Sequence, residues 1–85
     1  MDTSDMDMGP QPIDALLAAQ GLKNHDIVAA DDSKAVTHKV VGKARKGRRL
    51  TARMQRKILG AVNSCLAQRD APSVSFDALF NYVGP

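Results

Sequence analysis

The sequence has few aromatic residues and a single cysteine, and each scarcity excludes a class of protein. Only Phe76, Phe80 and Tyr82 are aromatic among 85 residues, so the core has to be built from aliphatic side chains and alanine. Such a composition favours helices over a β-sandwich. One cysteine, Cys65, permits no internal disulfide and no cysteine-based metal cluster. It falls in a helical apolar pattern, and we expect a small buried side chain rather than a nucleophile.

Long apolar segments are also missing. No segment approaches the length that spans a membrane, and the acidic N-terminus lacks the apolar region of a secretory signal. His25 and His38 lack metal-ligand spacing, and no nucleophile stands in a pattern with a base and a carboxylate. We therefore expect one small cytoplasmic domain that is not an enzyme and has no metal, cofactor or membrane partner.

Acidic residues are absent from the middle of the chain. Residues 34–57 carry ten Lys or Arg and no Asp or Glu, a charge of +10. Residues 1–33 carry seven Asp and one Lys (−6), and residues 58–85 carry one Arg and two Asp (−1). The net charge of +3 therefore conceals a strongly positive segment beside an acidic one. Such a positive segment attracts polyanions.

Apolar periodicity predicts an all-α fold of five short helices. Residues 1–11 are polar, acidic and without a period, so we expect a disordered acidic tail, and residues 12–85 should form a single helical domain. The expected helices span about 12–20, 25–31, 34–45, 52–68 and 76–83. Thr51 should cap the fourth helix. The β-branched residues at 36–41 would also suit a strand, but their helical spacing favours the third helix.

The predicted core follows from the same period. Its members are Ile13, Leu16, Leu17, Ile27, Val28, Val36, Val40, Met54, Ile58, Val62, Leu66, Leu79 and Phe80. Val83 is expected to face inward from the last helix.

Two segments resemble a known family. "HDIVAADDSKAVTHKVV" (25–41) looks like two short helices with a turn, and "GRRLTARMQRKILGAVN" (47–63) like a longer helix opened by a capping Thr. This order resembles the lambda-repressor-like helix-turn-helix class, which includes the headpiece of the lac-repressor family. The turn carries Asp31-Asp32 where the class usually has glycine, so the register of the third helix is open by about one residue. The resemblance implies a helix-turn-helix bundle and DNA binding.

Carried onto this chain, the resemblance places the third helix in the major groove and the following loop on the phosphates. The expected base contacts are Lys34, Ala35, Thr37, His38 and Lys39. The expected phosphate contacts are Lys43, Arg45, Lys46, Arg48, Arg49, Thr51 and Arg53. The backbone amides at 51–53 would form a second anion site at a helix N-terminus.

We therefore expect a small protein that binds double-stranded DNA, as a transcriptional regulator or nucleoid-type factor, and that can bind as a homodimer. A module that binds RNA, ribosomes or an acidic protein through the same basic surface is the alternative, because arginine-rich loops also suit RNA. A solvated charged face is the plainest interpretation. The acidic tail would either compete with phosphate for the basic surface or only aid solubility.

Overall fold

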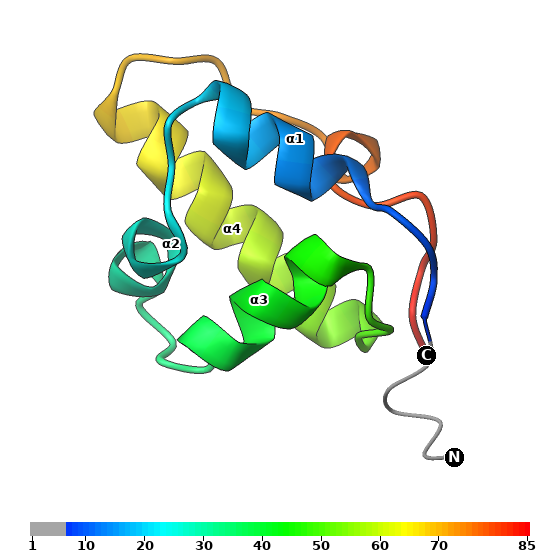
Figure 1. Ribbon diagram of the computed structural model, residues 1–85. Coiled ribbons are helices and arrows are strands. Elements are labelled where there is room, and N and C mark those ends of the chain that lie inside the picture. The colour runs from blue at the N-terminus through cyan, green and yellow to red at the C-terminus, as the bar shows by residue number, and fades with distance from the viewer. Residues whose placement is uncertain (1–6) are drawn as a thin grey trace.

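The computed structural model describes residues 7–85, and over these residues the chain folds into four α-helices and one short 3-10 helix (Figure 1). The α-helices are α1 (Pro12–Ala19), α2 (Asn24–Ala30), α3 (His38–Lys46) and α4 (Ala52–Gln68), and the 3-10 helix is η2 (Phe76–Ala78). The only strand-like pairing within residues 7–85 is one isolated antiparallel bridge between Asp7 and Arg48. The all-α prediction is confirmed, but the predicted fifth helix, 76–83, is reduced to the single turn of η2.

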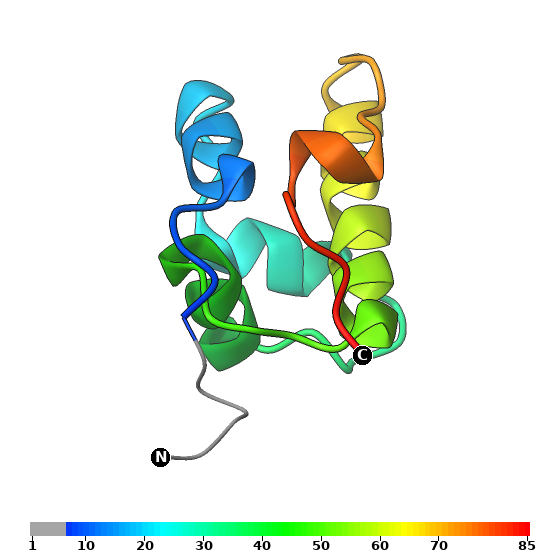
Figure 2. The ribbon, with the colours of Figure 1, turned by 90° about the vertical axis from the view of Figure 1, so that its right-hand side faces the viewer.

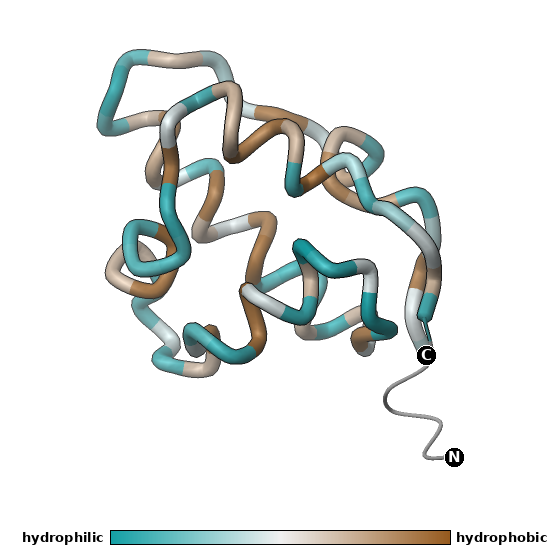
Figure 3. Tube along the Cα trace, viewed as in Figure 1, coloured by the Kyte–Doolittle hydropathy of each residue, from teal (hydrophilic) through white to brown (hydrophobic). Residues whose placement is uncertain are grey.

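The helices form two sides that enclose the core. Figure 2 shows α1 and α3 on one side and α4 on the other, with α2 running between them. α2 packs against both α4 and α3, while α1 packs against α3 and η2. Figure 3 shows hydrophobic positions recurring along α1 and α4, whereas α3 and the loop after it are mainly hydrophilic. α3 therefore buries only Val41 and Ala44 and leaves most of its polar residues on the surface.

The predicted core is largely confirmed. Nine of its members are buried, namely Ile13, Leu17, Ile27, Val36, Ile58, Val62, Leu66, Leu79 and Phe80. Leu16, Val28, Val40 and Met54 are half-buried against them. The prediction for Val83 is wrong, because its side chain is 71% exposed. Leu22 and Leu50, which the predicted core does not include, are buried although each lies in a connection between helices.

α4 begins and ends where the sequence predicts. The Thr51 side-chain oxygen accepts a hydrogen bond from the Met54 backbone amide at 3.2 Å, which fixes the first turn. From there an apolar stripe that includes Ile58, Val62 and Leu66 faces the core along the helix. The Thr51 cap and the regular apolar stripe therefore both predict the same helix.

α3 begins four residues later than predicted, at His38 instead of residue 34. The Asp31 carboxylate accepts hydrogen bonds from the Ser33 and Val36 backbone amides, at 3.2 and 2.8 Å, and so closes a non-helical turn. Lys34, inside this turn, has φ of +61°, which is outside the right-handed helical region. Thr37 then caps α3 by accepting from the Val40 amide at 3.2 Å. Lys34 and Ala35 therefore lie in the turn before α3 and not in its first turn.

Residues 7–11, which the sequence assigns to a disordered tail, are instead held against the domain. The Met8 amide donates to the Gly47 carbonyl at 2.7 Å. Gln11 is only 4% exposed, and its side chain pairs with Asn81 through two hydrogen bonds, at 2.7 and 2.8 Å. The remainder of the predicted tail, residues 1–6, lies outside the described residues.

Candidate nucleic-acid interface

α3 presents one apolar face to the core and one cationic face to solvent. Val41 and Ala44 are buried, whereas Lys39 and Lys46 are exposed. Helical geometry places these two lysines on the same side, seven residues or about two turns apart. The apolar spacing predicts Lys39 on this face, whereas Lys46 was expected in the loop after residue 45 and is instead the last residue of α3.

A hollow of about 490 Å³ lies on the cationic face of α3. The residues that line it are His38, Lys39, Gly42, Lys43, Lys46 and Arg48. None of these six lining residues is acidic, and four of them carry a positive charge at neutral pH, so the hollow attracts anions. This hollow, called here the α3 hollow, brings together the predicted base contacts His38 and Lys39 and three of the predicted phosphate contacts.

Arg45 does not join this group. Its guanidinium donates from Nε to the Asp14 carboxylate at 2.7 Å and from Nη1 to the Asn24 side-chain oxygen at 3.0 Å. The Arg45 side chain is 24% exposed. The side chain predicted to contact phosphate therefore ties α3 to α1 and α2 within the domain.

The loop that follows α3, residues 47–50, carries Arg48 and Arg49 and is called here the basic loop. Gly47 ends α3 with φ of +83°, a conformation that glycine adopts without strain. The Tyr82 hydroxyl accepts from the Leu50 amide at 2.9 Å and donates to the Arg48 carbonyl at 3.2 Å. One side chain, more than thirty positions along the chain, thus holds the backbone on both sides of Arg49.

The segment 82–85 also lies against the start of α4. The Gln55 side chain, fully buried, donates to the Tyr82 carbonyl at 3.1 Å and accepts from the Gly84 amide at 2.8 Å. The Pro85 carbonyl accepts from the Ala52 amide at 3.1 Å. Of the three amides at 51–53 that were expected to bind an anion, the Ala52 amide already has this backbone partner.

Two further hollows flank α3. The first lies beside its N-terminus, with Lys34, Thr37 and His38 on its wall, so Lys34 remains close to the start of α3 although it is not helical. Asp31 also lines it. Burial raises the pKa of this carboxyl, but the hydrogen bonds from Val36 and Ser33 outweigh burial, and the net effect is a pKa below its ordinary value.

The second flanking hollow is more apolar and was missed by sequence reasoning. The apolar residues Val40, Leu50 and Met54 line it together with the basic residues Lys43 and Arg49. The half-buried state of Val40 and Met54 follows from this position. The one indication of this hollow in the sequence is that Val40 falls at the edge of the apolar stripe of α3.

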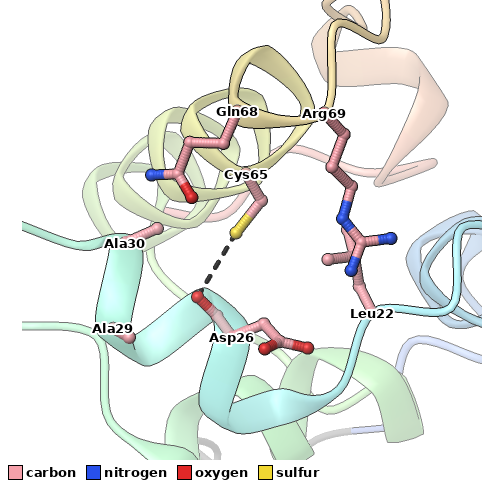
Figure 4. Close-up of a pocket in the computed structure, with 7 residues that line it drawn as sticks. All are labelled: Leu22, Asp26, Ala29, Ala30, Cys65, Gln68 and Arg69. Atoms are coloured by element: carbon pink, nitrogen blue, oxygen red, sulfur yellow. Dashed lines mark hydrogen bonds between the residues drawn. The ribbon is translucent and has the colours of Figure 1, made fainter.

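Cys65 lines a small pocket of about 170 Å³ between α2 and α4 (Figure 4). Its thiol donates to the Asp26 backbone carbonyl at 3.3 Å. Burial, followed by the charge of the Asp26 carboxylate, raises the pKa of this thiol, which keeps the sulfur protonated at neutral pH. The expectation of a buried cysteine is confirmed, and the pocket offers packing rather than an activated nucleophile.

Within residues 7–85, no three His, Cys, Asp or Glu side chains gather where they could hold a metal ion. The same residues contain no helix long and apolar enough to cross a membrane. Comparisons of the chain with protein-family models, with curated proteins and with solved structures find no match.

Proposed function

We propose that the protein binds double-stranded DNA, with the cationic face of α3 in the major groove and the basic loop on the phosphate backbone. The observation that carries this proposal is the α3 hollow, where one face of a helix and the loop after it gather His38, three lysines and Arg48. A helix of this width fits the major groove, and lysine side chains can donate to the O6 and N7 atoms of guanine.

The surroundings of α3 support this mode of binding. α2 packs behind α3 and against α4, so α3 is held from one side and left open on the other. Arg45 adds a second attachment through Asp14 and Asn24. A recognition element has to be rigid to discriminate between base sequences. The order α2, turn, α3 is also the one that the helix-turn-helix resemblance implies.

The basic loop supplies the contacts that carry no sequence information. Arg48 is exposed and Arg49 is half-exposed at one end of α3, and their backbone is fixed by Tyr82. Phosphate contacts from such side chains would position α3 on the duplex. A chain that binds DNA in this way would act in transcription regulation or in nucleoid organisation.

An NMR titration with duplex DNA of random sequence tests the proposal. We expect the backbone amides of residues 38–50 to shift, while those at the far end of α4 stay in place. Lys39→Ala should reduce the slope of log affinity against log salt by about one unit, because one phosphate or base contact is lost. Arg69→Ala is the matched control. It removes one positive charge at the C-terminal end of α4, opposite to the end that the basic loop adjoins, and should leave the slope unchanged.

Structured RNA is the competing ligand, because a basic loop of this kind can also follow an RNA backbone. The two ligands are separated by competition against labelled duplex DNA. If structured RNA displaces the DNA at a lower concentration than unlabelled duplex does, the DNA proposal is wrong and the same surface is an RNA interface.

A further inference from the structure

Gly42 lies midway along α3, half-buried, among the residues that line the α3 hollow. It is the fifth of the nine residues of the helix, a position where glycine weakens a helix relative to alanine. His38 and Lys46 lie one turn before and one turn after it on the same side, and Lys39 and Lys43 complete its surroundings in the α3 hollow.

The fold itself does not require a glycine at this position. The positive φ values of the described glycines belong to Gly9, Gly21 and Gly47, so Gly42 has an ordinary helical backbone. A Cβ atom built on Gly42 would meet only the side-chain nitrogen of Asn24, at 4.0 Å, which is an ordinary contact distance. Neither backbone conformation nor internal packing therefore accounts for the missing side chain.

The missing side chain does leave the backbone of α3 uncovered in the α3 hollow. The long side chains of Lys39, Lys43 and Lys46 surround this point. A ligand that enters between these lysines can approach the helix axis more closely than it could if residue 42 had a side chain. Glycine commonly serves where another molecule has to approach the backbone closely.

We propose that Gly42 sets how deeply α3 enters the major groove. Without a side chain there, the base edges can approach the helix while the neighbouring lysines reach outward to bases and phosphates on either side. Hydrogen bonds weaken steeply when their length increases, so even one methyl group at the centre would weaken the contacts of all flanking side chains together. This inference rests on the proposed function and adds to it the residue that controls the depth of docking.

The variant Gly42→Ala tests the inference because stability and binding should change in opposite directions. Its melting temperature should rise by about 2–8 °C, since alanine is the better helix former and its Cβ has room. Its affinity for duplex DNA should fall by about five- to a hundredfold, the effect of losing a good base contact. The slope of log affinity against log salt should stay unchanged, because no charge is altered. Gly42→Leu should lose more affinity than Gly42→Ala.

Gly60→Ala is the matched control. Gly60 is an exposed glycine inside α4, a Cβ there would have nothing within 4 Å, and it does not line the α3 hollow. This variant should gain the same stability as Gly42→Ala and bind duplex DNA like the wild type.

The outcomes separate this inference from the proposed function. If the wild type binds duplex DNA and Gly42→Ala binds equally well, the role of Gly42 is refuted while DNA binding stands. A loss of affinity in both glycine variants would mean that stiffening the fold, rather than bulk at residue 42, impairs binding, and this also refutes the role. If the wild type does not bind duplex DNA at low salt, the proposed function fails and this inference fails with it.

Discussion

Removing the Asp31 carboxylate should loosen the turn that sets the start of α3. That carboxylate accepts from two backbone amides, Ser33 and Val36, and also from the Ser33 hydroxyl. In Asp31→Ala the part-buried amide of Val36 loses its partner, as an amide does when a helix cap is removed. The expected loss is about 1–2 kcal/mol of unfolding free energy. For a domain of this size, this lowers the melting temperature by about 4–16 °C.

The pH dependence of Asp31→Asn provides an independent check. The hydrogen bonds hold the folded pKa of Asp31 below its ordinary value, so the carboxylate contributes stability at neutral pH. This contribution is lost as the pH falls through the lowered pKa. The difference in stability between wild type and Asp31→Asn should therefore be constant from neutral pH to about pH 5 and shrink below about pH 4. Urea unfolding followed by circular dichroism at several pH values measures it.

Asp32→Ala is the control for both experiments, because Asp32 is an exposed neighbour of the same charge. A change of less than about 0.5 kcal/mol in Asp31→Ala, the range of an ordinary surface substitution, would refute the role of the turn. So would a difference between wild type and Asp31→Asn that persists unchanged at low pH.

Three further predictions concern the core, the end of α3 and the basic loop. Ile58→Ala should cost about 2–5 kcal/mol in urea unfolding, because Ile58 is fully buried, and a loss under about 0.5 kcal/mol would mean that the site collapses without a cavity. Gly47→Ala should destabilise by more than about 1 kcal/mol, because φ is +83° and the new Cβ would overlap the Gly9 carbonyl oxygen; a melting temperature like that of the wild type contradicts this. Replacing Arg48 and Arg49 together by Ala should flatten the salt dependence of DNA affinity by about two units for all duplex sequences alike, and an unchanged slope would remove the basic loop from the interface.

The sequence predicts α4 well because its signals are local. Thr51 lies directly before α4, an apolar stripe runs along that helix, and both signals depend on residues close in the chain. The start of α3 depends instead on one side chain, Asp31, bonding to a backbone amide five residues away. The sequence "DDSK" predicts a turn but not its length, which explains why the predicted start of α3 was four residues too early.

The prediction of a last helix over residues 76–83 is wrong because of tertiary contacts. Its apolar spacing is helical, but the buried Gln55 bonds to the backbone of Tyr82 and Gly84, and the Tyr82 hydroxyl bonds to the basic loop. These bonds hold the segment after Phe80 outside a helix. No local sequence pattern predicts that Gln55 of α4 will bond to this segment.

The candidate site was predictable in part for the same reason. The cationic face of α3 follows from its apolar period, so Lys39 could be placed from sequence, but Lys46 was expected in the loop that follows. The ion pair that withdraws Arg45 joins residues 31 positions apart, and the sequence alone does not pair them. The significance of Gly42 also depends on which neighbours its Cβ would meet, which only the folded chain defines.

The pairing of Gln11 with Asn81 has a consequence for how the domain folds. These side chains bond across 70 positions of an 85-residue chain, and Gln55 bonds across 27 and 29 positions to the same final segment. Joining residues 70 positions apart costs more chain entropy than packing α2 against α4, where Asp26 and Cys65 bond across 39 positions, so the contact of Gln11 with Asn81 should close after α2, α3 and α4 have packed. Interactions that form late govern the unfolding rate rather than the folding rate. Substituting Gln11 should therefore leave the folding rate nearly unchanged and make the native domain open faster.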